Sequence, residues 1–157
     1  MNNNKSLTVE EIFNLAVQSH QEGKTDIAQD LYNQVLKINP SHSQVLNNLA
    51  IIFTNLKEYQ KAIDCYEKAI KINPNYADVH NNLGVVFKGL RNDQKAKECY
   101  EKAIELNPNF VNAHYNLGLV FKELREHQKA KKSFKKVIEL NPNHVDANNN
   151  LGSIFTD

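Results

Sequence analysis

The chain has 157 residues, of which 41% are hydrophobic and 24% are charged, a composition typical of a soluble globular protein of ordinary domain size. Nineteen basic and eighteen acidic side chains leave a formal net charge of +1, and the two signs are interleaved, so we expect neither nucleic acid nor a membrane as a partner. No apolar run approaches the roughly 18–20 residues that span a bilayer, and the N-terminus lacks the apolar segment of a signal peptide, so we expect a cytoplasmic protein.

A repeat of 34 residues runs through the sequence. The dipeptide Asn-Pro begins at residues 39, 73, 107 and 141, and many other positions keep the same spacing. We call each set of equivalent residues a column. The clearest columns are an alanine, an aromatic residue, and a leucine followed by a small residue: Ala28, Ala62, Ala96, Ala130; Tyr32, Tyr66, Tyr100, Phe134; and Leu15-Ala16, Leu49-Ala50, Leu83-Gly84, Leu117-Gly118, Leu151-Gly152. Such a period predicts a stack of similar structural units.

The expected elements follow this period along the chain. We predict a disordered N-terminal segment over residues 1–7 and a repeat array over 8–157. Each repeat is predicted to contain two helices, because apolar residues recur at helical spacing on both sides of a short polar break. The proline then ends the second helix. The expected bounds are about 9–42, 43–76, 77–110 and 111–144 for the repeats and 145–157 for a partial fifth repeat.

Helix starts and helix crossings are also marked. Thr8-Val-Glu-Glu11 and Ser41-His-Ser-Gln44 have the pattern of a capping box. Asparagines are the predicted N-caps of the later hairpins: Asn75, Asn109 and Asn143. The small residue after each leucine is expected where two helices cross, so that the backbones approach and the aromatic column fills the remaining space.

The pattern resembles the tetratricopeptide repeat family. The motif residues in the third repeat are Leu83-Gly84, Phe87, Ala96, Tyr100, Ala103 and Pro108. The resemblance covers the chain from about Val9 to Asp157. It implies an all-α fold, a right-handed α-solenoid of helical hairpins with four repeats plus one extra helix.

The turn between the two helices departs from the family pattern. The family often has a glycine there, and here only the first repeat keeps it, as Gly23. Lys57, Arg91 and Arg125 take its place in the later repeats. If the turn needs a left-handed residue, each replacement costs about 1 kcal/mol.

The first helices are expected to line a concave peptide-binding groove, as the resemblance implies. Their outward positions carry an asparagine column, a mixed polar and aromatic column, an aliphatic column and two lysines. Asparagine amides can pair with the peptide groups of an extended chain, the aliphatic residues offer apolar contact, and the lysines would attract an acidic partner. The candidate groove residues are Asn14, Asn48, Asn82, Asn116, Asn150, Asn47, Asn81, Tyr115, Ile51, Val85, Leu119, Lys88 and Lys122.

Two readings of the asparagine column stay open. Its amides either bind a ligand or bond to neighbouring turns and help to stack the repeats. The column resembles the asparagine ladder in the repeat arrays of protein O-GlcNAc transferases, which implies contact with peptide backbone, most directly for Asn48, Asn82 and Asn116. The glycosyltransferase domain of that family is absent. A second subfamily clamps a carboxylate with basic groove residues, and the corresponding columns here hold Glu10, Gln44, Asp78 and Asn112, so that mode is not expected.

No catalytic or metal-binding pattern is present, so we expect no enzyme, no cofactor and no metal. His80 and His114 share a column but lack carboxylate or cysteine ligands at a suitable spacing, and we interpret them as packing residues. Cys65 and Cys99 are interpreted in the same way. The histidines at hairpin junctions are expected to be solvated: His42 and His144.

The predicted function is a scaffold that binds an extended peptide or protein segment. One alternative is a substrate-recruiting module of a larger enzyme such as a glycosyltransferase, because the sequence stops thirteen residues into a fifth repeat. The other is a self-assembling element that stacks through its C-terminal end, where Leu151, Ile154 and Phe155 form the inner face of the last predicted helix.

Overall fold

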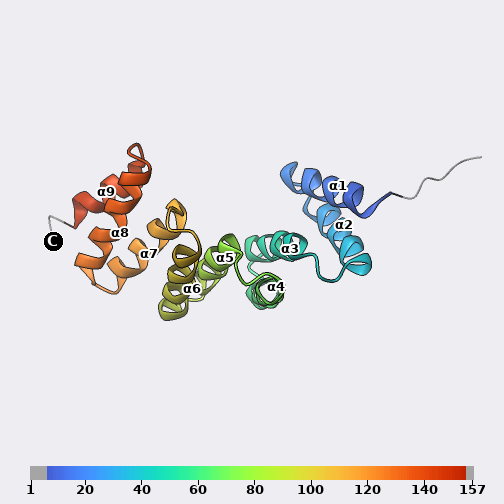
Figure 1. Cartoon of the computed structure of the whole chain (residues 1–157), viewed down its shortest axis with the longest axis horizontal. Helices are drawn as coiled ribbons and strands as arrows, with labels where there is room; N and C mark the ends of the chain where they lie inside the picture. Colours follow the sequence, from blue (N-terminus) through green and yellow to red (C-terminus); the bar gives the residue numbers. More distant parts are fainter. Residues whose placement is uncertain (1–6, 155–157) are drawn as a thin grey trace, which may run out of the picture. The chain divides into compact units, whose positions relative to one another are not determined.

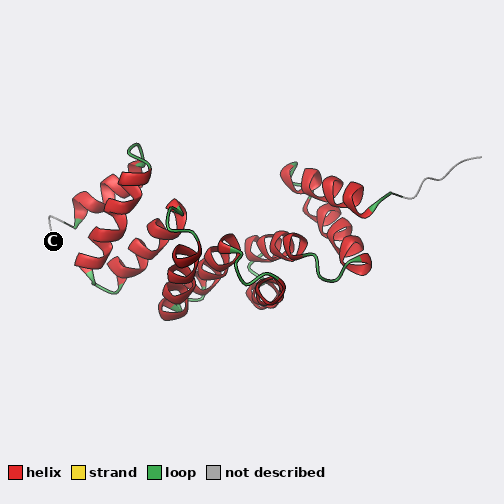
Figure 2. Ribbon diagram, viewed as in Figure 1, coloured by secondary structure: helices red, strands yellow, loops and turns green. Residues whose placement is uncertain are grey.

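The computed structural model describes residues 7–154, which form nine α-helices and no strand. Short turns join the helices into successive hairpins (Figure 1; Figure 2). The expectation of an all-α solenoid of helical hairpins is confirmed. The chain divides into two compact units, Met1–Pro74 and Asn75–Asp157. The expectations for residues 1–6 and for Phe155 lie outside the described residues.

The first unit contains two hairpins. α1 packs against α2, α3 packs against α4, and α2 packs against α3. Buried apolar side chains from α1, α2 and α3 form one cluster, in which Ala16, Tyr32 and Val45 are all completely buried. The helices are α1 (Val9–Gln21), α2 (Thr25–Ile38), α3 (Ser43–Asn55) and α4 (Tyr59–Ile72).

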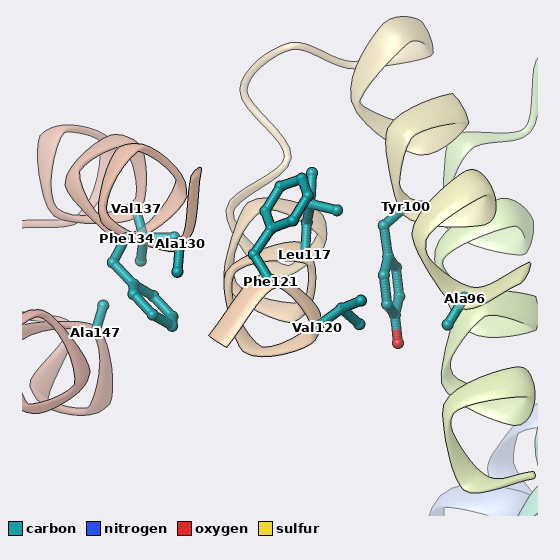
Figure 3. Close-up of a cluster of buried hydrophobic side chains, with 9 residues drawn as sticks. All are labelled: Ala96, Tyr100, Leu117, Val120, Phe121, Ala130, Phe134, Val137 and Ala147. Carbon is teal, nitrogen blue, oxygen red and sulfur yellow. The ribbon is translucent and has the colours of Figure 1, made fainter. Parts of the chain in front are cut away.

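The second unit contains two further hairpins and a last helix that packs on α8. Its core cluster is drawn in Figure 3, where Phe134 of α8 and Ala147 of α9 belong to the same group of buried side chains. Leu151 and Ile154 are half-buried against the same cluster. The helices are α5 (Ala77–Gly89), α6 (Asp93–Leu106), α7 (Val111–Glu123), α8 (His127–Leu140) and α9 (Val145–Ser153).

Small residues allow the two helices of each hairpin to approach closely. A Cβ atom added to Gly84 would lie 2.6 Å from Cε1 of Tyr100, and one added to Gly118 would lie 2.7 Å from Cε1 of Phe134. Both distances are too short for ordinary van der Waals contact, so the aromatic ring occupies the space that a side chain would need. The expectation from the leucine-small and aromatic columns is therefore confirmed in the second unit.

Replacing Gly84 with alanine is expected to lower the free energy of unfolding. Overpacking of a tight core contact costs about 1–3 kcal/mol, which exceeds the gain of about 1 kcal/mol in helix propensity. Gly152→Ala is the matched control, since no atom lies within 4 Å of a Cβ added there. In urea unfolding, the free energy of unfolding should be higher for Gly152→Ala than for the parent chain, and lower for Gly84→Ala. The packing interpretation fails if both variants gain stability equally.

The turns inside the hairpins need a left-handed residue. The φ angles are 74° at Gly23, 60° at Lys57, 57° at Arg91 and 57° at Arg125. At the second of these turns the Lys57 N–H donates to the Thr54 carbonyl at 3.0 Å and the Glu58 N–H donates to the Phe53 carbonyl at 2.8 Å. This is the hydrogen-bond pattern of a Schellman motif, which requires positive φ at its C′ residue. The left-handed geometry suggested by the family pattern is present in all four hairpins.

The strain at this turn can be measured by comparing Lys57→Gly with Lys57→Ala. Both variants lose the lysine charge, but only alanine keeps the Cβ atom that disfavours positive φ. We expect the glycine variant to unfold with a free energy about 1 kcal/mol higher than the alanine variant. Chemical denaturation of the two variants gives this difference directly. Equal stabilities would mean that the turn stores no backbone strain.

The first predicted capping box is confirmed and the second is wrong. The Glu11 N–H donates to Oγ1 of Thr8 at 3.2 Å, and the Thr8 N–H donates to the Glu11 carboxylate at 2.7 Å. At α3 the N-cap is His42, whose Nδ1 accepts from the Val45 N–H at 3.4 Å. The helix therefore starts one residue later than the Ser41 pattern predicted.

The prediction of asparagine N-caps for the later hairpins is also wrong. The caps of α5, α7 and α9 are Tyr76, Phe110 and His144. The asparagine before each proline explains the displacement, because its side chain forms an Asx turn. Asn107 accepts from the Asn109 N–H at 3.2 Å, and Asn141 accepts from the Asn143 N–H at 3.3 Å. Asn109 and Asn143 are thus donors within the turn, and the helix begins beyond them.

Candidate functional site

The predicted groove residues of the second unit link its first helices side by side. Nδ2 of Asn116 on α7 donates to Oδ1 of Asn81 on α5 at 3.1 Å. Nδ2 of Asn81 donates to Oδ1 of its neighbour Asn82 at 3.3 Å. We call Asn81, Asn82, Asn116 and Asn150 the amide ladder. The bond between Asn116 and Asn81 joins two successive repeats through side chains alone.

Lys122 extends this network from α7 to α9. Its ammonium group donates to Oδ1 of Asn150 at 2.9 Å and to Oγ of Ser153 at 3.0 Å. Nδ2 of Asn150 also donates to the Asp146 carbonyl at 2.9 Å, which fixes the orientation of its amide. The last amide of the ladder is therefore held by a cation and by its own helix.

Lys88 is held in the same way, but by carboxylates. It forms ion pairs with Asp93, at 3.1 Å, and with Glu123. Desolvation lowers the pKa of Lys88, but the hydrogen bonds and charges of Glu123 and Asp93 outweigh it and raise the pKa above its usual value. The positive charge expected to attract an acidic partner is therefore compensated within the chain.

In the first unit the equivalent amides pack against the preceding hairpin. Nδ2 of Asn48 donates to the Tyr32 hydroxyl at 3.0 Å, and Nδ2 of Asn47 donates to Oδ1 of Asn48 at 3.3 Å. Asn47 is 7% exposed, so its polar group is buried. Asn14 on α1 is exposed, and its side chain has no hydrogen bond within residues 7–154. The asparagine column thus differs in environment from repeat to repeat.

The aliphatic candidates differ in accessibility. Ile51 and Leu119 are half-buried, whereas Val85 is 41% exposed. Val85 therefore offers the most apolar surface of the three to a ligand.

Tyr115 is occupied by a contact that the sequence analysis did not anticipate. Its ring packs against His144 with centroids 4.9 Å apart, and Phe13 packs against His42 at the same separation. Each histidine also caps a helix, since Nδ1 of His144 accepts from the Ala147 N–H at 3.2 Å. The expectation that both histidines are solvated is wrong. The sequence signal for this contact was a histidine at the junction between two hairpins together with an aromatic residue in the preceding repeat.

His114, Cys65 and Cys99 are all partly buried. The His114 ring bonds to the Pro108 carbonyl at 2.9 Å. Cys65 and Cys99 are half-buried free thiols, and burial raises the pKa of Cys99 to about 11. A thiol with such a pKa stays protonated near neutral pH and is a poor nucleophile. Among the described residues, no group of three histidine, cysteine or acidic side chains has the geometry to hold a metal ion.

The Asn48–Tyr32 contact is predicted to stabilise the packing of successive hairpins. Tyr32→Phe removes only the hydroxyl, and Phe134 fills the same position in the fourth repeat. A double-mutant cycle of Tyr32→Phe and Asn48→Ala, followed by urea unfolding, should give a coupling energy of about 0.5–1.5 kcal/mol. Strictly additive effects would show that this hydrogen bond contributes nothing to stacking.

Comparison with known families supports a single assignment. The family model described as tetratricopeptide repeat matches residues 43–76, 77–110 and 111–144, more than half of the chain. Among curated protein sequences, none matches the chain significantly. Of the described helices, none combines the length and apolar character needed to cross a membrane.

Several solved structures are similar to this chain in fold. The MamA protein shares 25% identity, with a TM-score of 0.83, over 94% of this chain and 81% of that one. The first TPR domain of Spaghetti (RPAP3), bound to an HSP90 peptide, shares 27% identity and a TM-score of 0.71 over 73% of this chain and 90% of that one. YrrB, described as a TPR protein with an unusual peptide-binding site, shares 23% identity and a TM-score of 0.79 over 95% of this chain and 77% of that one, a likeness of fold alone.

Proposed function

Since the chain belongs to the tetratricopeptide repeat family, we propose that it is a protein-interaction module that holds an extended segment of another protein along its first helices. The amide ladder carries this proposal, because it places carboxamide groups from successive repeats on one face of the second unit. An extended segment presents backbone N–H and C=O groups along its length, and a carboxamide can donate to one and accept from the other.

The hydrogen bond of Asn116 within the ladder leaves capacity for a ligand. Asn116 uses one N–H in its bond to Asn81. A carboxamide has two N–H donors and two acceptor lone pairs, so its second N–H and its oxygen are available on a half-buried side chain. The bond to Asn81 fixes the amide orientation in advance, which reduces the conformational entropy lost on binding. Stacking and ligand binding are therefore compatible roles for the same side chain.

The surroundings of the ladder favour recognition of backbone over recognition of charge. Lys88 is paired with carboxylates and Lys122 with Asn150 and Ser153. The exposed Val85 supplies apolar contact. We therefore expect modest sequence selectivity and weak dependence of affinity on salt. The peptide bound by the Spaghetti domain supports this class of ligand, since that domain matches most of the present chain.

The test separates binding from stability. Peptides selected from a display library on the purified chain would be titrated by calorimetry against the Asn82→Ala and Asn116→Ala variants. We expect about a tenfold loss of affinity for each, the equivalent of one hydrogen bond to the ligand. Asn33→Ala on α2 is the control, because Asn33 is an exposed asparagine on a second helix.

Thermal unfolding of the same variants would be measured in parallel. Unchanged affinity together with reduced stability would show that the ladder only stacks the repeats. Equal losses of affinity in Asn33→Ala and Asn116→Ala would place the peptide elsewhere on the chain.

Self-association through α9 is the alternative within this proposal. Leu151 and Ile154 are half-buried against the core of the second unit, which leaves less apolar surface for a second copy than a bare helix face would. Light scattering over a concentration series tests it, and a constant monomer mass would exclude it.

A further inference from the structure

An open groove of about 1090 Å³ lies on the second unit, lined by α6, α7, α8 and the turn between α6 and α7. Its apolar lining comes from Ile104, Pro108, Leu117 and Phe121. Figure 3 shows the last two of these projecting from α7. Its polar lining comes mainly from α8. We call this surface the lysine groove.

The lysine groove is separate from the amide ladder. Successive residues of an α-helix are rotated by about 100°, so Leu117 and Phe121 share one side of α7. Asn116 and Leu119, two of the candidates for peptide contact on that helix, fall on the opposite side. A ligand in the lysine groove would therefore not occupy the surface of the proposed function.

The groove has a strong excess of positive charge. It is lined by every lysine of α8 and by one carboxylate, that of Glu139: the lysines are Lys129, Lys131, Lys132, Lys135 and Lys136. Lys136 pairs with Glu139 at 2.8 Å, and Lys129 pairs with Glu126. Lys132 and Lys135 are exposed and form no ion pair with any residue that the structure describes. Two ammonium groups thus stand uncompensated at the rim.

The other repeats show that folding does not require these two lysines. The equivalent positions hold Asp64 and Glu67 in α4, and Glu98 and Glu101 in α6. The fourth repeat therefore reverses the charge at both positions on an otherwise similar helix. Both lie in the middle of α8 rather than in its last turn, so the helix dipole gives no reason for a cation there.

The base of the groove also differs from the other repeats. Ser133 lines it at a position that holds Leu31 in the first repeat and cysteine in the second and third. The serine side chain is much smaller than that of leucine and close in size to that of cysteine. The fourth repeat therefore combines a small residue at the base of the groove with an uncompensated basic rim.

We propose that the lysine groove binds an acidic peptide segment that inserts an apolar side chain against Leu117 and Phe121. The carboxylates of such a segment complement Lys132 and Lys135, and long-range attraction of this kind raises association rates and selects partners by charge. A polynucleotide or a lipid surface would use the ammonium groups but not the recessed apolar base, and the chain carries a net charge of only +1. The groove volume is that of a pocket for a side chain with its flanking residues.

The experiment uses a short fluorescein-labelled peptide of glutamates around one central phenylalanine, titrated with the full chain and followed by anisotropy. The double variant Lys132→Glu and Lys135→Glu restores acidic residues like those of α6, so it is expected to fold. We expect it to weaken binding by about tenfold or more. The affinity of the parent chain should fall as salt is raised.

A matched control carries the same change in net charge. Lys37→Glu and Lys71→Glu lie on α2 and α4, at positions that hold Glu105 and Glu139 in the later repeats. This variant should bind the peptide as the parent chain does. An equal loss of affinity in both double variants would overturn the proposal, because it would show attraction by net charge alone.

Ser133→Leu tests the base of the groove without changing any charge, and Leu31 shows that the repeat accommodates leucine there. We expect weaker peptide binding with circular dichroism unchanged. The proposal is overturned if a peptide with glycine in place of phenylalanine binds as tightly. It is also overturned if the lysine pair controls binding of a single-stranded oligonucleotide or of phosphatidylserine vesicles while the peptide does not bind.

Discussion

The close approach of two helices within each hairpin is the constraint on which the rest of the molecule depends. One residue without a bulky side chain faces one aromatic ring, as Gly84 faces Tyr100 and Gly118 faces Phe134. The ring is almost completely buried in each hairpin, so it sets the separation of the helices. A hairpin held in this way still has apolar surface on its outer sides, and it buries that surface only against a neighbour. The regular spacing of the first helices within each unit follows from this packing.

Hydrogen bonds between side chains also hold neighbouring repeats together, in addition to the apolar packing. Asn48 reaches the buried Tyr32 across a repeat boundary in the first unit, and Asn116 reaches Asn81 in the second. Burial of a polar group is costly unless it is hydrogen-bonded, so these amides select one register of neighbouring repeats over others. The amides on the face that we propose for ligand binding are then oriented before the ligand arrives. On the opposite side of α7, the composition of α8 distinguishes one repeat from the rest.

Much of the fold could be predicted because the relevant contacts repeat at a constant interval. The small and aromatic columns located the helix crossings, and the replaced turn glycines pointed to left-handed residues that the φ angles of Lys57, Arg91 and Arg125 confirm. Contacts specific to one repeat were missed. The pairing of Lys88 with Glu123 joins residues of neighbouring repeats that belong to different columns. The stacking of His42 on Phe13 joins two variable columns, and neither residue type alone signals the contact.

Within the second unit, hydrogen bonds bring Asn81, Asn82 and Asn116 together. The partners of the candidate groove residues within the chain could not be read from the columns. An asparagine column is compatible with solvation, stacking or ligand contact, and only the position of the neighbouring helix decides which amide groups remain available. The asparagines before the prolines illustrate the same limit at short range. The side chains of Asn107 and Asn141 accept hydrogen bonds from the backbone N–H groups of Asn109 and Asn143, which were predicted to be N-caps. Each following helix therefore begins later than predicted.

The left-handed turns also carry an electrostatic consequence. Lys57, Arg91 and Arg125 each stand directly beyond the C-terminus of a first helix, where the aligned peptide dipoles leave partial negative charge. A cation at this end stabilises a helix by about 0.3–1 kcal/mol, which offsets much of the cost of positive φ. Gly23 avoids the strain but supplies no charge. A turn with glycine and a turn with lysine or arginine are therefore close in free energy, which explains how both occur within one array.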